Sequence, residues 1–263
     1  MDPGFRTPLL DCFRRGEVTR DIRLLAARGA LAPRALEQLA LLVFLVGDQD
    51  AEIAAVAAAT LDRLPPVAVA KFIGRSEVGD DLRAFFIARG IQPIAPASST
   101  SAKDEDEPLI ETEADEASVE DSEDEEKTRV LLNMLPVPQR MKFALKGTRS
   151  QRAVLIRDPN KVIAAAVLSS PKLSDTEVEA FSRMANVSED VLRTIGMSRA
   201  WTRSYTVVSG LVRNPKTPPA ISLPLLSRLN ERDVKGLMTD RNVPEALRLA
   251  ARKIMAVNES RKQ

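Results

Sequence analysis

Residues 211–247 read LVRNPKTPPAISLPLLSRLNERDVKGLMTDRNVPEAL, and their spacing of apolar residues and prolines indicates the fold class. Short runs with apolar residues at helical spacing alternate here with Asn-Pro, Thr-Pro-Pro and Val-Pro. Proline lacks the backbone N–H that a helix interior needs, and it pushes the preceding residue out of the helical region. The stretch therefore predicts several helices of roughly two to four turns, with prolines where one helix ends or the next begins.

The rest of the chain shows the same pattern of helix-breaking residues, with glycine or proline at most of the expected helix ends. Ser174 and Glu177 have the spacing of a capping box. Pro224 leaves two interpretations open, the first turn of a new helix or a kink within one. No segment alternates apolar and polar residues for long enough to predict a strand. We expect helices over 19–29, 33–47, 48–65, 66–74, 80–90, 128–135, 138–147, 148–158, 160–170, 174–185, 188–196, 199–214, 221–229, 231–238 and 244–257.

Composition narrows the chemistry of this 263-residue chain. Apolar residues make up 44%, but only eight Phe, one Trp and one Tyr are present, which favours helices packed through small side chains. The chain has no histidine, which excludes Ser-His-Asp and Cys-His nucleophile pairs and all histidine-containing metal sites. We therefore expect no catalytic residues, no cofactor and no metal site. Cys12, the single cysteine, is interpreted as a packing residue, with a reactive thiol as the alternative.

The sequence also bears on location. A lone cysteine fits a reducing compartment. The longest apolar run, LALLVFLVG at 39–47, is far shorter than the roughly 18 residues of a membrane span. The first residues, MDPGFRTPLLDCFRRG, lack the layout of a secretory signal. We expect a cytoplasmic protein without membrane contact.

Charge divides the chain into three blocks, with net charges of 0 over 1–97, −12 over 98–127 and +13 over 128–263. Low hydrophobicity and self-repulsion in the acidic block predict a disordered linker. We expect an N-terminal helical unit over 1–92, a disordered acidic linker over 93–126 and a basic C-terminal helical-repeat unit over 127–263. Either the acidic linker masks the basic unit, or it is a spacer.

An internal repeat is consistent with this organisation. Residues 169–195 align with 213–239 at an offset of 44, with Pro171 on Pro215 and Asn186 on Asn230. That period lies in the ~40–47 residue range of two-helix repeats. Helices this short are marginal alone and need neighbours. The pattern predicts an all-α fold of short helical hairpins stacked as an α-solenoid.

Two phrases carry a family resemblance. DQDAEIAAVAAATLDRLP (48–65) resembles the second helix of a HEAT repeat, and RNPKTPPAISLPLL (213–226) resembles the Asn-Pro-x-Thr-Pro-x phrase of bacterial HEAT-like and leucine-rich-repeat-variant proteins. The resemblance covers about half the chain and implies stacked HEAT-like units without an assigned activity. Some leucine-rich-repeat-variant proteins hold an iron–sulfur centre with a cysteine cluster that this chain lacks, so that chemistry is not carried over.

The basic unit supplies the candidate binding residues. Arginine with aromatic side chains can contact phosphates and stack on bases, and arginines also suit an acidic protein surface. The alternative is a solvated basic face with Trp201 and Tyr205 in the core. The candidates for an anionic partner are Arg140, Lys142, Lys146, Arg149, Arg152, Arg157, Arg199, Trp201, Arg203 and Tyr205.

Two functions remain open at this point. The first is a non-enzymatic helical-repeat scaffold or adaptor that mediates protein–protein interaction. The alternative is a nucleic-acid-binding protein that uses the basic C-terminal unit. A HEAT-like DNA glycosylase would need an aromatic-lined cleft with a carboxylate, and only Trp201 and Tyr205 offer walls for one.

Overall fold

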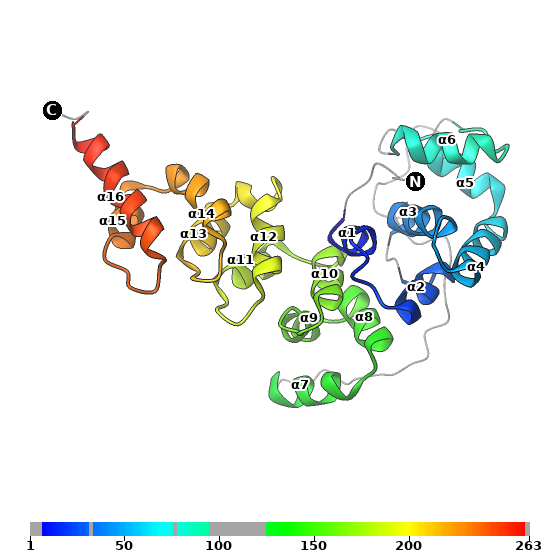
Figure 1. Ribbon diagram of the computed structural model, residues 1–263, viewed down its shortest axis with the longest axis horizontal. Coiled ribbons are helices and arrows are strands. Elements are labelled where there is room, and N and C mark those ends of the chain that lie inside the picture. The colour runs from blue at the N-terminus through cyan, green and yellow to red at the C-terminus, as the bar shows by residue number, and fades with distance from the viewer. Residues whose placement is uncertain (1–6, 32–33, 76–77, 95–124, 261–263) are drawn as a thin grey trace.

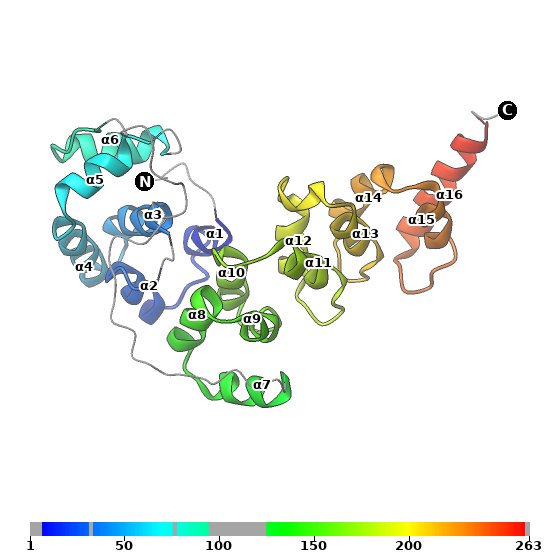
Figure 2. The same cartoon turned by 180° about the vertical axis from the view of Figure 1, so that it is seen from behind.

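The computed structural model describes residues 7–31, 34–75, 78–94 and 125–260. Within these ranges every regular element is a helix and no strand occurs, so the predicted all-α class is confirmed. Figure 1 shows the helices in chain order, and Figure 2 shows the same arrangement from behind. The predicted linker lies mostly outside the described residues.

Six helices form the described part of the N-terminal half. Helix α3 is almost wholly apolar and lies at its centre, in contact with α1, α2, α4 and α6. Helix α1 was not predicted from sequence; Thr7 caps it by accepting a hydrogen bond from the Leu10 N–H. The helices are α1 (Pro8–Arg14), α2 (Arg20–Ala27), α3 (Ala35–Val46), α4 (Ala51–Asp62), α5 (Pro66–Ile73) and α6 (Asp80–Ala88).

The C-terminal half continues with short helices whose starts are set locally. The capping box of Ser174 and Glu177 is present as predicted, and Thr148 with Gln151 forms a second one. The helices are α7 (Glu125–Met134), α8 (Val137–Lys146), α9 (Arg149–Leu155), α10 (Lys161–Ser169), α11 (Asp175–Arg183), α12 (Glu189–Met197), α13 (Tyr205–Arg213), α14 (Pro219–Leu225), α15 (Glu231–Leu237) and α16 (Glu245–Ser260), with 3-10 turns at Trp201–Arg203 and Leu226–Arg228.

Successive helices of this half pair into hairpins, and each hairpin packs on the one before it. We call the odd-numbered helices α7 to α15 the A-helices and the even-numbered helices α8 to α16 the B-helices. A-helices pack on A-helices from α7 through α13, and B-helices pack on B-helices from α8 through α16. Two kinds of turn therefore alternate along the chain. An A–B turn joins the helices of one hairpin, and a B–A turn leads from one hairpin to the next.

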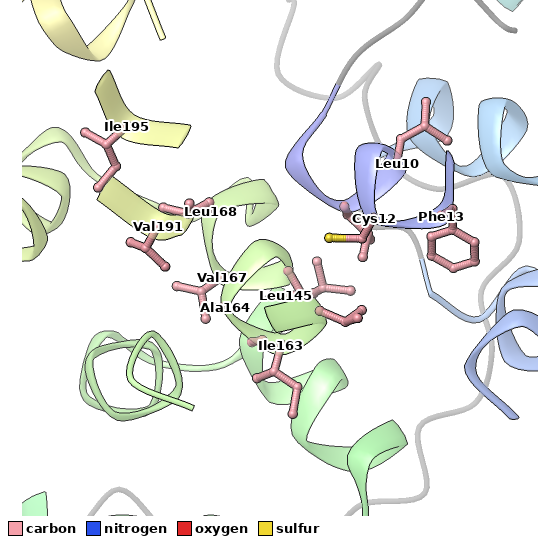
Figure 3. Close-up of a cluster of buried hydrophobic side chains, with 14 of the residues drawn as sticks. Leu10, Cys12, Phe13, Leu145, Ile163, Ala164, Val167, Leu168, Val191 and Ile195 are labelled. Carbon is pink, nitrogen blue, oxygen red and sulfur yellow. The ribbon is translucent and has the colours of Figure 1, made fainter. Parts of the chain in front are cut away.

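The two halves share one hydrophobic core. Helix α1 packs against α10 and α2 packs against α8, and both views place α1 beside α10. The backbone N–H of Leu9 donates to Ser169 Oγ at 3.2 Å across this contact. Figure 3 shows the Cys12 sulfur of α1 directed toward α10, while Leu10 and Phe13 point away from α10. The first helix of the chain thus completes the core of the C-terminal half.

The expected helix over 199–214 is wrong in its first part. Trp201–Arg203 forms a 3-10 turn, Ser204 is extended at φ −68° and ψ 123°, and the α-helix begins only at Tyr205. Thr202 stabilises the 3-10 turn because its hydroxyl donates to the Ser198 carbonyl at 2.7 Å. Trp201 and Tyr205 therefore do not share a helix.

The 44-residue repeat is also wrong in register. It aligns Pro171, which follows a B-helix, with Pro215, which follows an A-helix. A-helices α9, α11, α13 and α15 instead begin 26, 30 and 26 residues apart. Proline interrupts helices at both kinds of turn, so the prolines alone do not fix the register. Pro224 lies inside α14, whose first residue is Pro219, so it does not begin a helix.

No single helix among the described residues has the length and apolar content needed to cross a membrane. Helices α4 and α5 meet that composition only when taken together, across a bend of 91°.

Candidate interaction surface

Two of the predicted binding arginines form ion pairs with buried carboxylates of the chain. Arg152 on α9 forms a bidentate pair with Glu177 on α11, with Nε–Oε1 and Nη2–Oε2 distances of 2.9 and 3.0 Å. Their side chains are 5% and 3% exposed. Burial alone would raise the pKa of Glu177, but hydrogen bonds from Arg152 and Ser174 hold it below its usual value. The pair ties consecutive A-helices together.

Arg140 on α8 has a similar internal role. Its guanidinium contacts Asp158, whose side chain is 1% exposed and also accepts from the Asn160 N–H at 2.8 Å. The N-terminal half repeats this arrangement, since Arg23 on α2 contacts Asp48 at 2.6 Å. In both halves the aspartate caps the turn before a long apolar helix while an arginine from a preceding helix neutralises it.

The other predicted residues divide between half-buried and exposed positions. Lys142 on α8 and Arg157 in the α9–α10 turn are half-buried. Trp201 is half-buried and packs against the core, as the alternative interpretation expected. Tyr205 is 42% exposed, and its hydroxyl donates to Asp233. The remaining four candidates are exposed, namely Lys146, Arg149, Arg199 and Arg203.

These four exposed cations adjoin B–A turns, together with two that the sequence analysis did not select, Lys172 and Arg228. No carboxylate in the described part of the chain forms a salt bridge with any of the six. Asp175 and Glu231 are exposed beside the same turns, so cations outnumber carboxylates. We call these six the basic turn edge: Lys146, Arg149, Lys172, Arg199, Arg203 and Arg228.

Hydrogen bonds join neighbouring B–A turns into this edge. Lys172 Nζ donates to the Lys146 carbonyl at 3.2 Å, and Ser170 Oγ donates to the Leu145 carbonyl at 2.7 Å. Two hairpins further on, the Arg228 guanidinium donates to the Thr202 carbonyl. Lys146, Lys172 and Arg228 lie at or within three residues of the carbonyl end of a B-helix, where a positive charge is favourable. These hydrogen bonds, each from a B–A turn to the B–A turn one hairpin earlier, hold the cations on one side of the hairpins.

The A–B turns form a different, inward-facing network. Asn214 Nδ2 donates to the Ser182 and Met184 carbonyls at 3.0 and 2.9 Å, and its Oδ1 accepts from the Lys216 N–H. Asn214 is 3% exposed. Its donors satisfy carbonyls at the end of α11 that would otherwise be buried without partners. This turn therefore locks one hairpin onto the previous one.

A shallow pocket lies where α1, α10 and α12 meet, with Cys12 in its wall. Cys12 is 2% exposed, and burial raises its thiol pKa to about 11, against the lowering effect of Arg15. The thiol is therefore protonated at neutral pH, which agrees with the packing interpretation. Lys161 and Asp190 on the pocket rim are paired with each other at 2.8 Å.

The described residues contain no group of three or more cysteine or carboxylate side chains placed to hold a metal ion. Comparison with known proteins gives no further constraint, because no family model, curated protein or solved structure matches the chain.

Sequence reasoning found four of the six basic-edge residues but missed Lys172 and Arg228. Each lies beside a turn in a less basic stretch, so local clustering of charge did not select it. The available signal was its position, since both follow the last residue of a B-helix by three residues. Using it requires knowing which turns are B–A turns.

Proposed function

We propose that this protein is a non-enzymatic helical-repeat scaffold of HEAT-like α-solenoid type that binds protein partners in the bacterial cytoplasm. Successive hairpins that pack only on their neighbours make a long surface from short helices, which suits extended protein contacts. The consecutive contacts of the A-helices and of the B-helices support this class. The 26–30 residue spacing of the A-helices is shorter than that of most HEAT repeats.

The observation that carries the proposal is the contrast between buried and exposed polar groups. Buried arginine, aspartate, glutamate and asparagine side chains bond within the chain, as Arg152, Glu177 and Asn214 show. The basic turn edge instead presents exposed cations at four successive B–A turns. A row of exposed cations without a salt bridge to any described carboxylate suits recognition of another molecule more than stability.

Nucleic acid remains the second candidate because the same cations suit phosphates. The ten residues selected from sequence do not favour it, since Arg152 is buried in an ion pair, Arg140 is half-buried in another, and Trp201 is half-buried. A phosphate-tracking surface requires exposed cations and exposed stacking faces together.

Affinity capture tests the proposal. The tagged full-length protein is recovered from an extract of its native cells, with and without nuclease. We expect specific proteins to be retained after nuclease treatment, in amounts comparable with the bait. Loss of every partner on nuclease treatment would contradict the scaffold and support the nucleic-acid alternative.

A further inference from the structure

The α12–α13 turn is where the basic turn edge also carries exposed apolar surface. Met197, the last residue of α12, is 70% exposed, and Tyr205, the first residue of α13, is 42% exposed. In sequence, Arg199 and Arg203 lie between these two residues, and both side chains are exposed. Methionine, tyrosine and arginine are the residue types enriched where proteins bind proteins. The turn thus combines an apolar contact with two cations.

Neighbouring turns extend this site in both directions. Arg228 from the next B–A turn reaches the carbonyl of Thr202, inside the same 3-10 turn. On the other side, Ser204 Oγ donates to Glu179 of α11 at 2.8 Å, which fixes the turn against the previous A-helix. Lys172 lies in the middle of the B–A turn that leads into that helix. The site is therefore held in place by the hairpins on either side.

One carboxylate distinguishes between possible anionic partners. Asp233 accepts a hydrogen bond from the Tyr205 hydroxyl and pairs with Arg213 at 2.5 Å. Its partial exposure places a carboxylate, whose charge Arg213 only partly offsets, beside the aromatic ring. A nucleic-acid strand stacking on Tyr205 would bring its phosphates toward that carboxylate, which is unfavourable. A peptide can place an apolar side chain there and its carboxylates elsewhere on the edge.

We propose that the basic turn edge binds an acidic peptide segment of a partner protein. One apolar side chain of the peptide contacts Met197 and the ring of Tyr205, and its carboxylates pair with Arg199, Arg203 and the cations of the flanking turns. This inference rests on the proposed scaffold function and specifies the chemistry of the partner.

Fluorescence anisotropy with the full-length protein tests the inference with three labelled probes of equal charge. The first is a peptide of glutamate and glycine, the second has leucine in place of some glycines, and the third is an oligothymidine. We expect the leucine-containing peptide to bind most tightly. Its affinity should fall as salt rises, because ionic contacts are screened.

Matched variants distinguish the effect of the basic turn edge on peptide affinity from the effect of the protein's net charge. Arg199→Glu with Arg203→Glu should weaken the leucine-containing peptide about tenfold or more. Arg241→Glu with Lys253→Glu makes the same charge change at exposed positions away from the B–A turns, and should change binding less than about twofold. Met197→Gln should weaken the leucine-containing peptide and leave the glutamate–glycine peptide unchanged.

Three results would overturn the inference: equal weakening by both charge-reversed proteins, indifference of all probes to Met197→Gln, or tightest binding of the oligothymidine. The proposed function fails separately. If the Arg199→Glu, Arg203→Glu protein still captures the same nuclease-resistant partners, the scaffold stands and only the peptide site is wrong.

Discussion

The A–B and B–A turns of the C-terminal half both join an A-helix to a B-helix, yet their polar side chains differ in exposure. The A–B turns direct side chains such as Asp158 and Asn214 inward, where each bonds an earlier helix or its end. The B–A turns leave Arg199 and Arg203 exposed and without a salt bridge to any described carboxylate. Both kinds of turn bond neighbouring hairpins, since Ser170 and Arg228 also donate to earlier carbonyls. The difference is that the B–A turns add exposed arginines that remain available to a partner. The same residue type, arginine, serves both purposes within a few helices.

The buried pair of Arg152 and Glu177 gives the largest expected effect. Glu177→Ala should destabilise the protein by about 3–5 kcal/mol, because it leaves a buried guanidinium without its counter-charge. Urea unfolding followed by circular dichroism measures the change. Replacing both residues together, Arg152→Met with Glu177→Leu, should recover part of the loss, because the Gly147 carbonyl and the Ser174 N–H still lose their partners. A double variant as unstable as the single one would show that these hydrogen bonds, and not the unpaired guanidinium, determine the loss.

The lowered pKa of Glu177 also predicts that the free energy of unfolding decreases at acidic pH. Its pKa is lowered in the folded state, so its contribution is present above the unfolded carboxyl pKa of about 4.3 and is lost as pH falls through the folded value. The stability difference between wild type and Glu177→Gln should therefore shrink on acidification.

Asp158→Ala tests the arginine–aspartate arrangement that both halves share. We expect a loss of about 2–3 kcal/mol, smaller than for Glu177 because the Arg140 side chain is 15% exposed. Asp48→Ala is the matched change in the N-terminal half. It should cost less, since Arg23 is 29% exposed and more easily hydrated. The opposite ranking would indicate that packing, rather than the ion pair, determines these losses.

Most helix boundaries could be predicted because their signals are local, although α1 and the start of α13 were missed. Ser174 and Glu177 lie three residues apart and form the predicted capping box, and Gly29 takes the positive φ of 81° expected after a helix. The roles of the arginines could not be predicted. Arg149 and Arg152 are neighbours in sequence, but one is exposed while the other finds Glu177 25 residues away. That distinction depends on tertiary packing, as does the shared core of α1 and α10.

Asn214→Ala tests whether A–B turns lock hairpins to one another. It removes two donors to buried carbonyls of α11 and the turn-capping acceptor, so we expect a loss of about 1–2 kcal/mol. Asp240→Ala is the control at the equivalent turn of the next hairpin, where the side chain only accepts from the Asn242 N–H at 2.9 Å. Equal losses would mean that the turn, and not the contact between hairpins, is what Asn214 stabilises.

The smallest expected effect is at the basic turn edge. Arg199→Ala with Arg203→Ala should change the free energy of unfolding by less than about 0.5 kcal/mol, because both side chains are exposed and form no salt bridge with a described residue. Arg228→Ala should cost slightly more, about 0.5–1 kcal/mol, since it loses the bond to the Thr202 carbonyl. Urea titrations of these proteins beside Glu177→Ala would place the two kinds of turn on one scale. A loss of several kcal/mol from the Arg199, Arg203 change would show that this edge is structural as well. Arg199 and Arg203 would then contribute to the stability of the fold, and the inference that they are free to bind another molecule would be wrong.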